Sequence, residues 1–304
     1  MGQRLRFTKM HGLGNDFVVI DAVRQHVQLQ PRQIQAISDR HFGVGCDQLL
    51  LVEPPTSEGA AFRYRIFNAD GHEVGQCGNG ARCFAAFVRA QGLTDATEIA
   101  VETASGPLVL SLEPDERIRV RMGAPRFGAA QIPVALGAPG LTFAAGEPGN
   151  TVALDLGGET VRGTALSLGN PHFVLGVDDL DRTPIVELAA RIQAHPGFPE
   201  GVNVGFAQVI APTRVRLRVV ERGVGETWAC GSGACAAVAA GQSWGVLDPR
   251  VEVALRAGLL EIFRETGGDL MMIGPVASVF EGEVDIEALD QAYPVSATMA
   301  PRRA

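Results

Sequence analysis

The chain of 304 residues is long enough for two domains of ordinary size, and its 46% apolar and 20% charged residues are typical of a globular protein with a sizeable core. Its 26 basic and 34 acidic side chains give a net charge of −8, which repels a phosphate backbone and excludes nucleic acid as an expected partner. No apolar stretch approaches the roughly 20 residues that cross a bilayer, and the polar start lacks the apolar core of a signal peptide, so we expect a cytoplasmic protein without a membrane partner.

In chain order, four segments predict helices: a short one after Pro31, then residues 81–90, 187–195 and 234–241. The second and the fourth are rich in alanine, which is a strong helix former. Asn79 and Ser232 are the expected N-caps of these two helices. Gly92 and Gly245 lie where the helices are expected to end.

Strands are expected to outnumber helices. Residues 117–122 and 214–219 alternate arginine with apolar side chains, which is typical of strands that bury one face and keep their arginines in solvent. Residues 124–150 are rich in Gly, Pro and Ala and predict a loop between the two halves of the chain. Residues from about Tyr293 onward are expected to form a loose tail.

The second half of the chain repeats landmarks of the first half in the same order. Leu13-Gly14-Asn15 resembles Leu168-Gly169-Asn170, Cys77-Gly78-Asn79-Gly80-Ala81 resembles Cys230-Gly231-Ser232-Gly233-Ala234, and Met122-Gly123 resembles Ile273-Gly274. The three offsets are 155, 153 and 151 residues. A single match would carry little weight, but three matches at nearly one offset indicate an internal duplication.

Two of the cysteines, Cys77 and Cys230, lie just before the alanine-rich helices. A helix N-terminus exposes unpaired N–H groups and partial positive charge, a setting that lowers a thiol pKa and can hold a carboxylate. If two such thiols faced one bound α-amino acid, one thiolate could take the α-proton and the other thiol could return a proton from the opposite face. The helix N-termini would stabilise the charge of the carbanion intermediate.

Other interpretations of the cysteines stay open at this point. Five cysteines in a chain without a signal peptide argue against a disulfide scaffold, although oxidation could join Cys77 to Cys230. The spacing within each cysteine element does not match a zinc site and no histidine pair lies nearby, so no metal is expected. Cys83 and Cys235 are interpreted as small buried helix residues, and Cys46 as a packing residue in a glycine-rich turn.

Five stretches of the chain match one known family. They are residues 9–17, 65–71, 76–83, 169–172 and 221–235. On these stretches the sequence resembles diaminopimelate epimerase over nearly its whole length, and the full set is specific to that family among enzymes of the same fold. Three positions depart from the family pattern. Val224 replaces a usual alanine, Cys46 occupies a position that is often apolar, and Phe280 stands where some members carry a tyrosine linked to dimer formation.

The resemblance implies an α+β fold with two pseudo-symmetric domains. In each domain a curved mixed β-sheet is expected to wrap around a central helix, with the active site in the interdomain cleft. We expect residues 1–124 and 279–304 to form the N-terminal epimerase domain, closed by the C-terminal strands. Residues 125–278 are expected to form the C-terminal epimerase domain.

The resemblance also implies roles for residues at matching positions. Cys77 and Cys230 match the catalytic acid/base pair, His172 and Glu221 match groups that tune the thiol pKa values, and Phe280 matches a dimer contact. The positions that match substrate-binding residues are Asn15, Gln48, Asn68, Gly78, Asn79, Asn170, Asn203, Glu221, Arg222, Gly231 and Ser232.

The implied activity is the epimerisation of LL-2,6-diaminopimelate to meso-diaminopimelate in lysine and peptidoglycan precursor biosynthesis, by a homodimer that uses no cofactor. The composition agrees with this expectation, because Lys9 is the only lysine that could carry pyridoxal phosphate. Two alternatives are kept. The chain could act on another amino acid by the same two-thiol route, or it could be a thiol redox or binding protein, which would exchange no α-proton.

Overall fold

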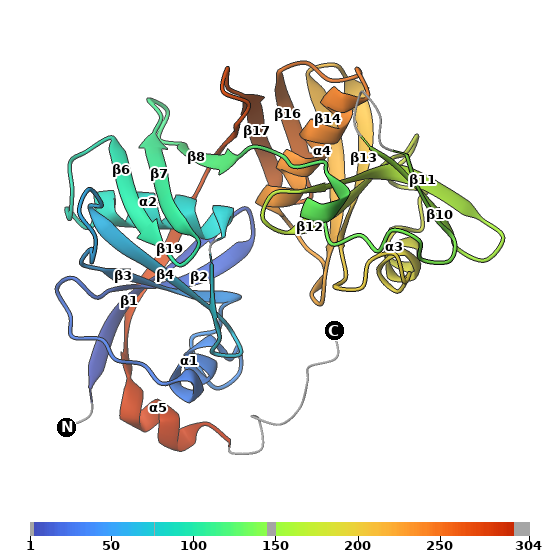
Figure 1. Cartoon of the computed structure of the whole chain (residues 1–304). Helices are drawn as coiled ribbons and strands as arrows, with labels where there is room; N and C mark the ends of the chain where they lie inside the picture. The colour runs from blue at the N-terminus through green and yellow to red at the C-terminus, as the bar shows by residue number, and fades with distance from the viewer. Residues whose placement is uncertain (1–2, 76, 145–149, 295–304) are drawn as a thin grey trace. The chain divides into compact units, whose positions relative to one another are not determined.

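The computed structural model of the chain describes residues 3–75, 77–144 and 150–294 (Figure 1). Two compact units make up the chain: unit 1 comprises Met1–Val120 and Gly274–Ala304, and unit 2 comprises Arg121–Ile273. The domain divisions expected from the sequence, after residues 124 and 278, fall a few residues further along the chain. Most of the expected tail, part of the expected loop between the halves, and Gln76 of the third matched stretch lie outside the described residues.

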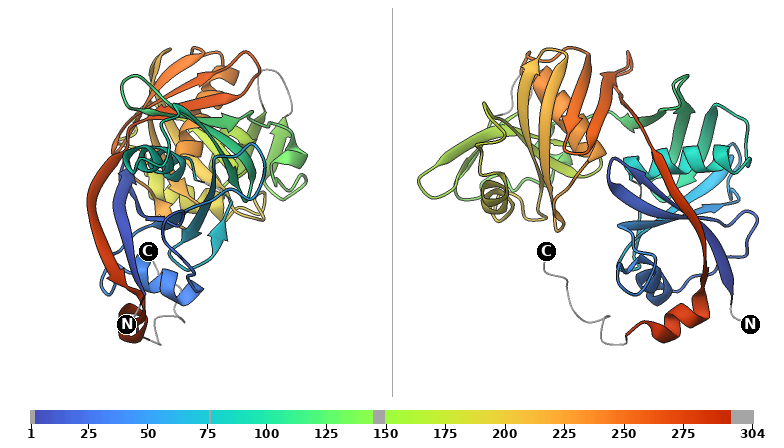
Figure 2. Two further views of the ribbon diagram at one scale, coloured as in Figure 1. Left: turned by 90° about the vertical axis from the view of Figure 1, so that its left-hand side faces the viewer. Right: turned by 180° about the vertical axis from the view of Figure 1, so that it is seen from behind.

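Unit 1 is a mixed sheet formed by both ends of the chain. Its elements are β1 (Arg4–Gly12), β2 (Asn15–Asp21), α1 (Pro31–Ser38), β3 (Gln48–Glu53), β4 (Phe62–Asn68), β5 (Glu73–Val74), α2 (Gly78–Ala90), β6 (Glu98–Thr103), β7 (Gly106–Leu112), the start of β8 (Ile118–Gly123), β19 (Ala277–Asp285) and α5 (Ile286–Ala292). The strands follow the order β19-β1-β2-β3-β4-β6-β7-β8, with β5 beside β4. The β2–β3 and β4–β6 pairs are parallel and the others antiparallel. Figure 2 shows β19, near the red end of the colour scale, running along β1.

Unit 2 is continuous in sequence and is also a mixed sheet. Its elements are η1 (Ala129–Gln131), β9 (Leu141–Ala144), β10 (Thr151–Asp155), β11 (Thr160–Ser167), β12 (Pro171–Gly176), α3 (Ile185–Gln193), β13 (Asn203–Ala211), β14 (Arg214–Glu221), β15 (Gly225–Glu226), α4 (Gly231–Ser243), β16 (Arg250–Leu255), β17 (Gly258–Arg264) and β18 (Leu270–Gly274). The strand order is β9-β10-β11-β12-β13-β14-β16-β17-β18, with β15 beside β14. Here β12–β13 and β14–β16 are the parallel pairs.

The two units repeat one pattern, which confirms the predicted pseudo-symmetric α+β fold. The segment from β1 to β8 and the segment from β11 to β18 both run strand, strand, helix, three strands, helix, three strands. The parallel pairs fall at the same places in both segments. In each unit the second helix packs against several strands of its own sheet, α2 against β1–β4 and β7, and α4 against β11–β14, β16 and β17.

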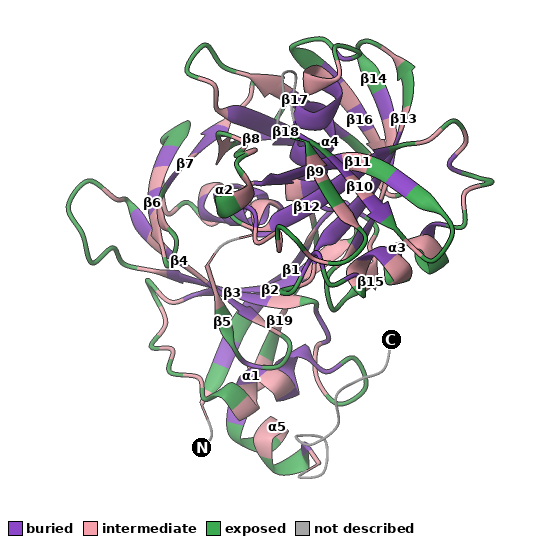
Figure 3. Cartoon of the chain, turned by 45° about the vertical axis from the view of Figure 1, so that its right-hand side comes forward, coloured by how far each residue is buried: buried purple, intermediate pink, exposed green. Residues whose placement is uncertain are grey.

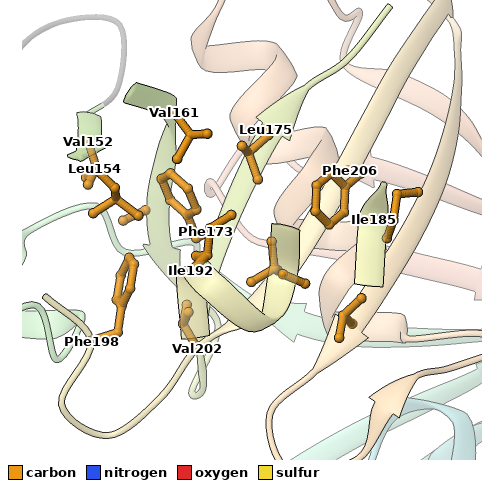
Figure 4. Close-up of a cluster of buried hydrophobic side chains, with 14 of the residues drawn as sticks. Val152, Leu154, Val161, Phe173, Leu175, Ile185, Ile192, Phe198, Val202 and Phe206 are labelled. Carbon is orange, nitrogen blue, oxygen red and sulfur yellow. The ribbon is translucent and has the colours of Figure 1, made fainter. Parts of the chain in front are cut away.

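Each sheet buries both of its faces, and this explains the continuous apolar runs in its central strands. In β2, Val18 and Ile20 belong to a cluster with α1 and α5, while Phe17 lies against the start of α2. Unit 2 has the same arrangement. Figure 4 shows Ile185 and Ile192 of α3 beside Phe173 and Phe206 of the strands.

The central helices are largely buried by the sheets around them, and α4 consists mostly of small residues. Ten of the thirteen residues of α4 are buried, and the helix is drawn mostly as buried in Figure 3. A helix that is apolar all round is expected to be buried in this way. Near the start of each helix a glycine allows close packing. A Cβ atom on Gly80 would lie 2.7 Å from the Tyr64 hydroxyl, and one on Gly233 would lie 2.9 Å from a Val219 methyl.

Several local predictions are confirmed and two are wrong. The four predicted helices exist, and Gly92 and Gly245 follow α2 and α4 with positive φ angles of 62° and 73°. The predicted N-caps are wrong, because the helices begin earlier: Cys77 and Cys230 are themselves the N-caps, and Asn79 and Ser232 lie in the first turn. The segment before the tail also contains α5, which the sequence analysis missed.

Candidate active site

The strands of unit 1 bring three predicted substrate-binding residues to one end of the sheet. Asn15 begins β2, Gln48 begins the parallel strand β3, and Asn68 ends β4. Gln48 is in register with Phe17 on one side and with Asn68 on the other, and its amide nitrogen donates to Asn68 Oδ1 at 2.9 Å. Since β4 runs antiparallel to β3, the end of β4 and the start of β3 share this end of the sheet.

Cys77 lies among asparagine side chains. Its Sγ is 3.7 Å from Asn15 Oδ1, and the same oxygen accepts a hydrogen bond from Asn79 Nδ2 at 3.2 Å. Cys77 is partly buried, whereas Asn79 is only 3% exposed. We call Cys77, Asn15, Asn79, Gln48 and Asn68 the Cys77 half-site. Gly78 is the first helical residue, so the first-turn N–H groups that follow Cys77 have no intrahelical acceptors.

Unit 2 repeats this geometry with different side chains. Pro171 begins β12 directly after Asn170, Asn203 begins the parallel strand β13, and Glu221 ends β14. His172 and Asn203 are in register, as Phe17 and Gln48 are in unit 1. Cys230 is the N-cap of α4, and Gly231 and Ser232 open the helix.

Cys230 is surrounded differently from Cys77. Its Sγ lies 3.6 Å from the Ser232 hydroxyl, which accepts a hydrogen bond from Asn170 Nδ2 at 3.3 Å. Burial, and after it the Glu221 carboxylate, raises the pKa of the Cys230 thiol well above its usual value, against the opposing effects of Ser232 and Gly233. The Glu221 carboxylate also accepts from the Thr227 hydroxyl at 2.7 Å. We call Cys230, Ser232, Asn170, His172 and Glu221 the Cys230 half-site.

His172 is a neutral member of the Cys230 half-site. Its imidazole is 1% exposed, and burial lowers its pKa to about 3. Its Nε2 is 3.1 Å from Asn170 Oδ1. Because Asn170 in turn donates to Ser232, the imidazole is linked to Cys230 through two intervening side chains. His172 can therefore orient the half-site without carrying a charge.

The remaining predicted residues lie nearby or elsewhere. Asn203 Oδ1 accepts the backbone N–H of Arg222 at 2.8 Å, so these two residues are held together. The Arg222 guanidinium is exposed and donates to the Glu200 carbonyl at 2.6 Å. Phe280 lies on β19, is 48% exposed and packs edge to face against Phe7 at 5.9 Å between ring centroids. It belongs to neither half-site.

A charged cluster that was not predicted from the sequence lies behind Asn15. Asp47 Oδ2 accepts from Asn15 Nδ2 at 2.9 Å, and Arg40 pairs with both Asp47 and Asp16 at 2.8 and 2.7 Å. Lys9 lies 2.6 Å from Asp16. Although burial opposes the effect, the hydrogen bonds from Arg40 and Lys9 hold the pKa of Asp16 well below its usual range. The signal was present in the sequence as acidic residues directly after Asn15 and directly before Gln48.

Comparison with known sequences gives one family. The family model described as diaminopimelate epimerase matches residues 7–128 and 164–279. A diaminopimelate epimerase from Azoarcus sp. (strain BH72) is 53% identical over 283 residues, which cover 93% of this chain and 99% of that protein. A diaminopimelate epimerase from Nitrosomonas europaea is 51% identical over 285 residues, covering 93% of this chain and the whole of that protein, 100%.

Comparison with solved structures gives the same fold at low identity. A hydroxyproline epimerase from Agrobacterium vitis superposes with a TM-score of 0.64 at 16% identity, covering 93% of this chain and 94% of that one. A phenazine biosynthesis protein of the PhzF family from Bacillus anthracis gives a TM-score of 0.61 at 17% identity, covering 93% and 99%. No described helix of this chain is long and apolar enough to cross a membrane.

Proposed function

The chain belongs to the diaminopimelate epimerase family, and we propose that it interconverts LL- and meso-2,6-diaminopimelate by inverting one α-carbon. The observation that carries the proposal is the repeated half-site. Cys77 and Cys230 each stand at the N-cap of the central helix of one unit, at the same end of equivalent strands. A reaction that removes a proton from one face of a carbon and returns one to the other face needs two such groups.

In the proposed mechanism, one cysteine thiolate takes the α-proton and becomes a thiol. The α-carbon then carries a lone pair that is delocalised into the α-carboxylate. The other cysteine, present as a thiol, gives its proton to the opposite face and becomes the thiolate. The two cysteines have exchanged protonation states at the end, so Cys77 and Cys230 act as base and acid in one direction and as acid and base in the other. No cofactor takes part in these steps.

The first turns of α2 and α4 would stabilise the intermediate. The backbone N–H groups of Gly78, Asn79, Gly231 and Ser232 belong to first turns, where N–H groups have no intrahelical acceptors. Such groups and the helix dipole favour negative charge. We therefore propose that they hold the α-carboxylate, where they lower the energy of the carbanion more than that of the bound substrate.

Asn15 and Gln48 would line the substrate site near the reacting centre, as the position of Asn15 beside Cys77 suggests. The other predicted substrate-binding residues, Asn68, Asn170, Asn203 and Arg222, would read the distal amino acid group of the substrate. Asn15, Gln48, Asn68, Asn170 and Asn203 offer amide donors and acceptors, Arg222 offers a guanidinium for a carboxylate, and Glu221 offers a carboxylate for an ammonium group. Diaminopimelate carries an amino acid group at each end, so an amino acid that lacks the distal group should bind poorly. His172 and Glu221 would tune the Cys230 thiol, His172 through Asn170 and Glu221 by its charge.

We further propose a cytoplasmic homodimer that serves lysine and peptidoglycan precursor biosynthesis, with diaminopimelate as its small-molecule partner. The proposed dimer contact is the face of β19 around Phe280. Val279 and Phe280 are large apolar side chains that are 56% and 48% exposed on this strand. Exposed neighbouring apolar residues on a strand are a common feature of subunit interfaces.

The test is proton exchange in D2O. The reduced protein, stripped of pyridoxal phosphate and treated with a chelator, is incubated with LL-diaminopimelate, and deuterium at the α-carbon is followed together with meso product. Incorporation with meso formation supports the proposal. If L-proline or trans-4-hydroxy-L-proline exchanges instead, the chain is an epimerase of another amino acid. If none of these substrates exchanges, the thiol redox or binding alternative is favoured.

A further inference from the structure

Two asparagines connect the Cys77 thiol to a charged group at each end of a hydrogen-bonded chain. The Arg82 guanidinium donates to Asn79 Oδ1 at 2.7 Å, and Asn79 Nδ2 donates to Asn15 Oδ1 at 3.2 Å. Asn15 Nδ2 then donates to Asp47 Oδ2 at 2.9 Å. The Cys77 thiol lies beside this chain, with its Sγ 3.7 Å from Asn15 Oδ1. All five side chains belong to unit 1.

The two end groups fix the orientation of both amides. A guanidinium can only donate and a carboxylate can only accept, so Asn79 must present its oxygen to Arg82 and Asn15 must present its nitrogen to Asp47. The hydrogen bond from Asn79 Nδ2 to Asn15 Oδ1 is compatible with both of these orientations. Cys77 consequently meets the oxygen of Asn15, which accepts a hydrogen bond from a thiol but repels a thiolate.

Both end groups are themselves held in place. The Arg82 side chain is 0% exposed, and it passes so close to the first hairpin that a Cβ atom on Gly12 would lie 2.9 Å from its terminal nitrogen. Asp47 pairs with Arg40 at 2.8 Å and accepts the backbone N–H of Asp16 at 3.2 Å. A chain of polarised hydrogen bonds that is anchored at both ends resists reorientation.

The second half-site does not repeat these charges. By the offset between the cysteines, Arg82 corresponds to Cys235, and by the register of the strands Asp47 corresponds to Val202. The equivalent link in unit 2 runs from neutral His172 through Asn170 to the Ser232 hydroxyl. The charged chain is therefore a property of the Cys77 half-site and makes the two thiols chemically different.

We infer that Arg82 and Asp47 are positioning residues that lock Asn79 and Asn15 in the orientation that favours the thiol form of Cys77 over its thiolate. Neither residue needs to touch the substrate for this role. The inference deepens the proposed function and rests on it only in taking Cys77 as a reacting group. Its consequence, a change in the ionisation of the Cys77 thiol, can be measured on the protein without substrate.

Two further titratable groups next to Cys77 in the described part of unit 1, Tyr64 and Cys83, do not change their charge in the pH range of the experiment. The Tyr64 hydroxyl of β4 donates to the Cys77 carbonyl at 3.3 Å, and burial raises the pKa of Tyr64 well above its usual value. Burial likewise raises the pKa of Cys83, in α2, to about 12. Both groups stay neutral through the pH range in which an ordinary thiol titrates. The charged groups behind Asn15 are Asp47, with its partners Arg40, Asp16 and Lys9.

The experiment follows the rate at which iodoacetamide alkylates Cys77 as a function of pH. The full-length, reduced protein is used without substrate, and the Cys77 peptide is quantified by mass spectrometry. Asp47→Ala and Asp47→Asn remove the same charge, but only Asp47→Asn keeps a side-chain oxygen that can accept from Asn15. The double variant Asp47→Ala/Arg82→Met removes one negative and one positive charge, so the charge effects largely cancel while both anchors are lost.

We expect the pH midpoint of the alkylation profile to fall clearly more for Asp47→Ala than for Asp47→Asn. In the double variant it should fall by about one pH unit, because the Asn15 amide is released and can turn its N–H groups toward the Cys77 thiolate. Equal shifts for the two Asp47 variants, or an unshifted profile in the folded double variant, would overturn the inference. If the double variant does not fold, the comparison of Asp47→Ala with Asp47→Asn still tests the inference, because the Asp47 side chain is 44% exposed and is not needed for the core. An inactive wild-type enzyme with these shifts would refute the proposed function and leave the positioning role intact.

Discussion

At the scale of single residues, serine in place of Cys77 or Cys230 separates acid/base chemistry from folding. Serine is nearly isosteric with cysteine but is a much poorer base at neutral pH. We expect Cys77→Ser and Cys230→Ser each to reduce meso formation by at least about 100-fold, the usual contribution of a general acid or base. Cys83→Ala and Cys235→Ala are matched controls from the same two helices, and both should retain most activity. Normal turnover by either serine variant, with unchanged thermal unfolding, would contradict the two-thiol mechanism.

The buried His172 makes a prediction about stability as a function of pH. Its pKa is about 3 in the folded chain against 6.5 for a free imidazole, so the unfolded chain binds the additional proton between these values. The part of the folding stability that depends on keeping His172 neutral is therefore fully present above about pH 6.5 and is lost as the pH falls toward 3. Between pH 7.5 and pH 5 the loss from this one group should be roughly 2 kcal/mol.

His172→Gln isolates this contribution, because an amide can still donate to Asn170 but does not titrate. The free energy of unfolding, measured by urea denaturation at pH 7.5 and at pH 5, should fall less for the variant than for the wild type. Parallel losses in the two proteins would mean that His172 is protonated in the folded state.

At the scale of elements, the start of α4 shows how the packing of a helix sets the position of a thiol. A Cβ atom on Gly233 would lie 2.9 Å from a Val219 methyl and 3.3 Å from Cys230 Sγ. Gly233→Ala should therefore cost roughly 1–3 kcal/mol of stability through overpacking, and it should also reduce turnover by moving Cys230. Gly267→Ala is the matched control, because nothing lies within 4 Å of its Cβ position and it should leave both quantities near wild type. Thermal unfolding and meso formation measure the two effects.

The same element shows what the sequence could and could not predict. The alanine-rich run predicted α4, because alanine is a strong helix former, and Gly245 after the run predicted where the helix ends. Its exact start was predicted wrongly. Ser232 is a preferred N-cap residue, but the helix begins before it, at Gly231, and Gly233 of the first turn lies close to Val219 of β14. A local N-cap preference contains no information about such contacts with another element.

At the scale of the whole molecule, the duplication was predictable and the difference between its halves was not. Three sequence landmarks at nearly one offset predicted two similar units, because repeated motifs keep their order in the fold. The charged chain from Arg82 to Asp47 could not be predicted, since it joins side chains from a helix, a hairpin and a loop that only the folded sheet brings together. The duplicated backbone thus carries two half-sites with different electrostatics.

Unit 1 depends on both ends of the chain, and this dependence leads to the last prediction. Strand β19 pairs with β1 along nearly its whole length, from Arg4 opposite Asp285 to His11 opposite Ala277. Beyond it, Ile286 of α5 is 2% exposed in the core cluster of unit 1, and Asp290 pairs with Arg32 of α1 at 2.7 Å. Unit 2 is continuous in sequence and uses none of these residues.

A chain that ends at Ile273 should therefore lose unit 1 selectively. Without β19 the edge of β1 is unpaired, and β1 is one of the strands that pack against α2, whose N-cap is Cys77. We expect the truncated chain to lose epimerisation, and limited proteolysis should degrade residues 1–120 while residues 121–273 survive longer. A chain that ends at Pro294 keeps every described element and should remain active. Full activity of the shorter chain, or equal protease sensitivity of its two units, would mean that β19 is dispensable and that the two ends of the chain do not form one cooperative unit.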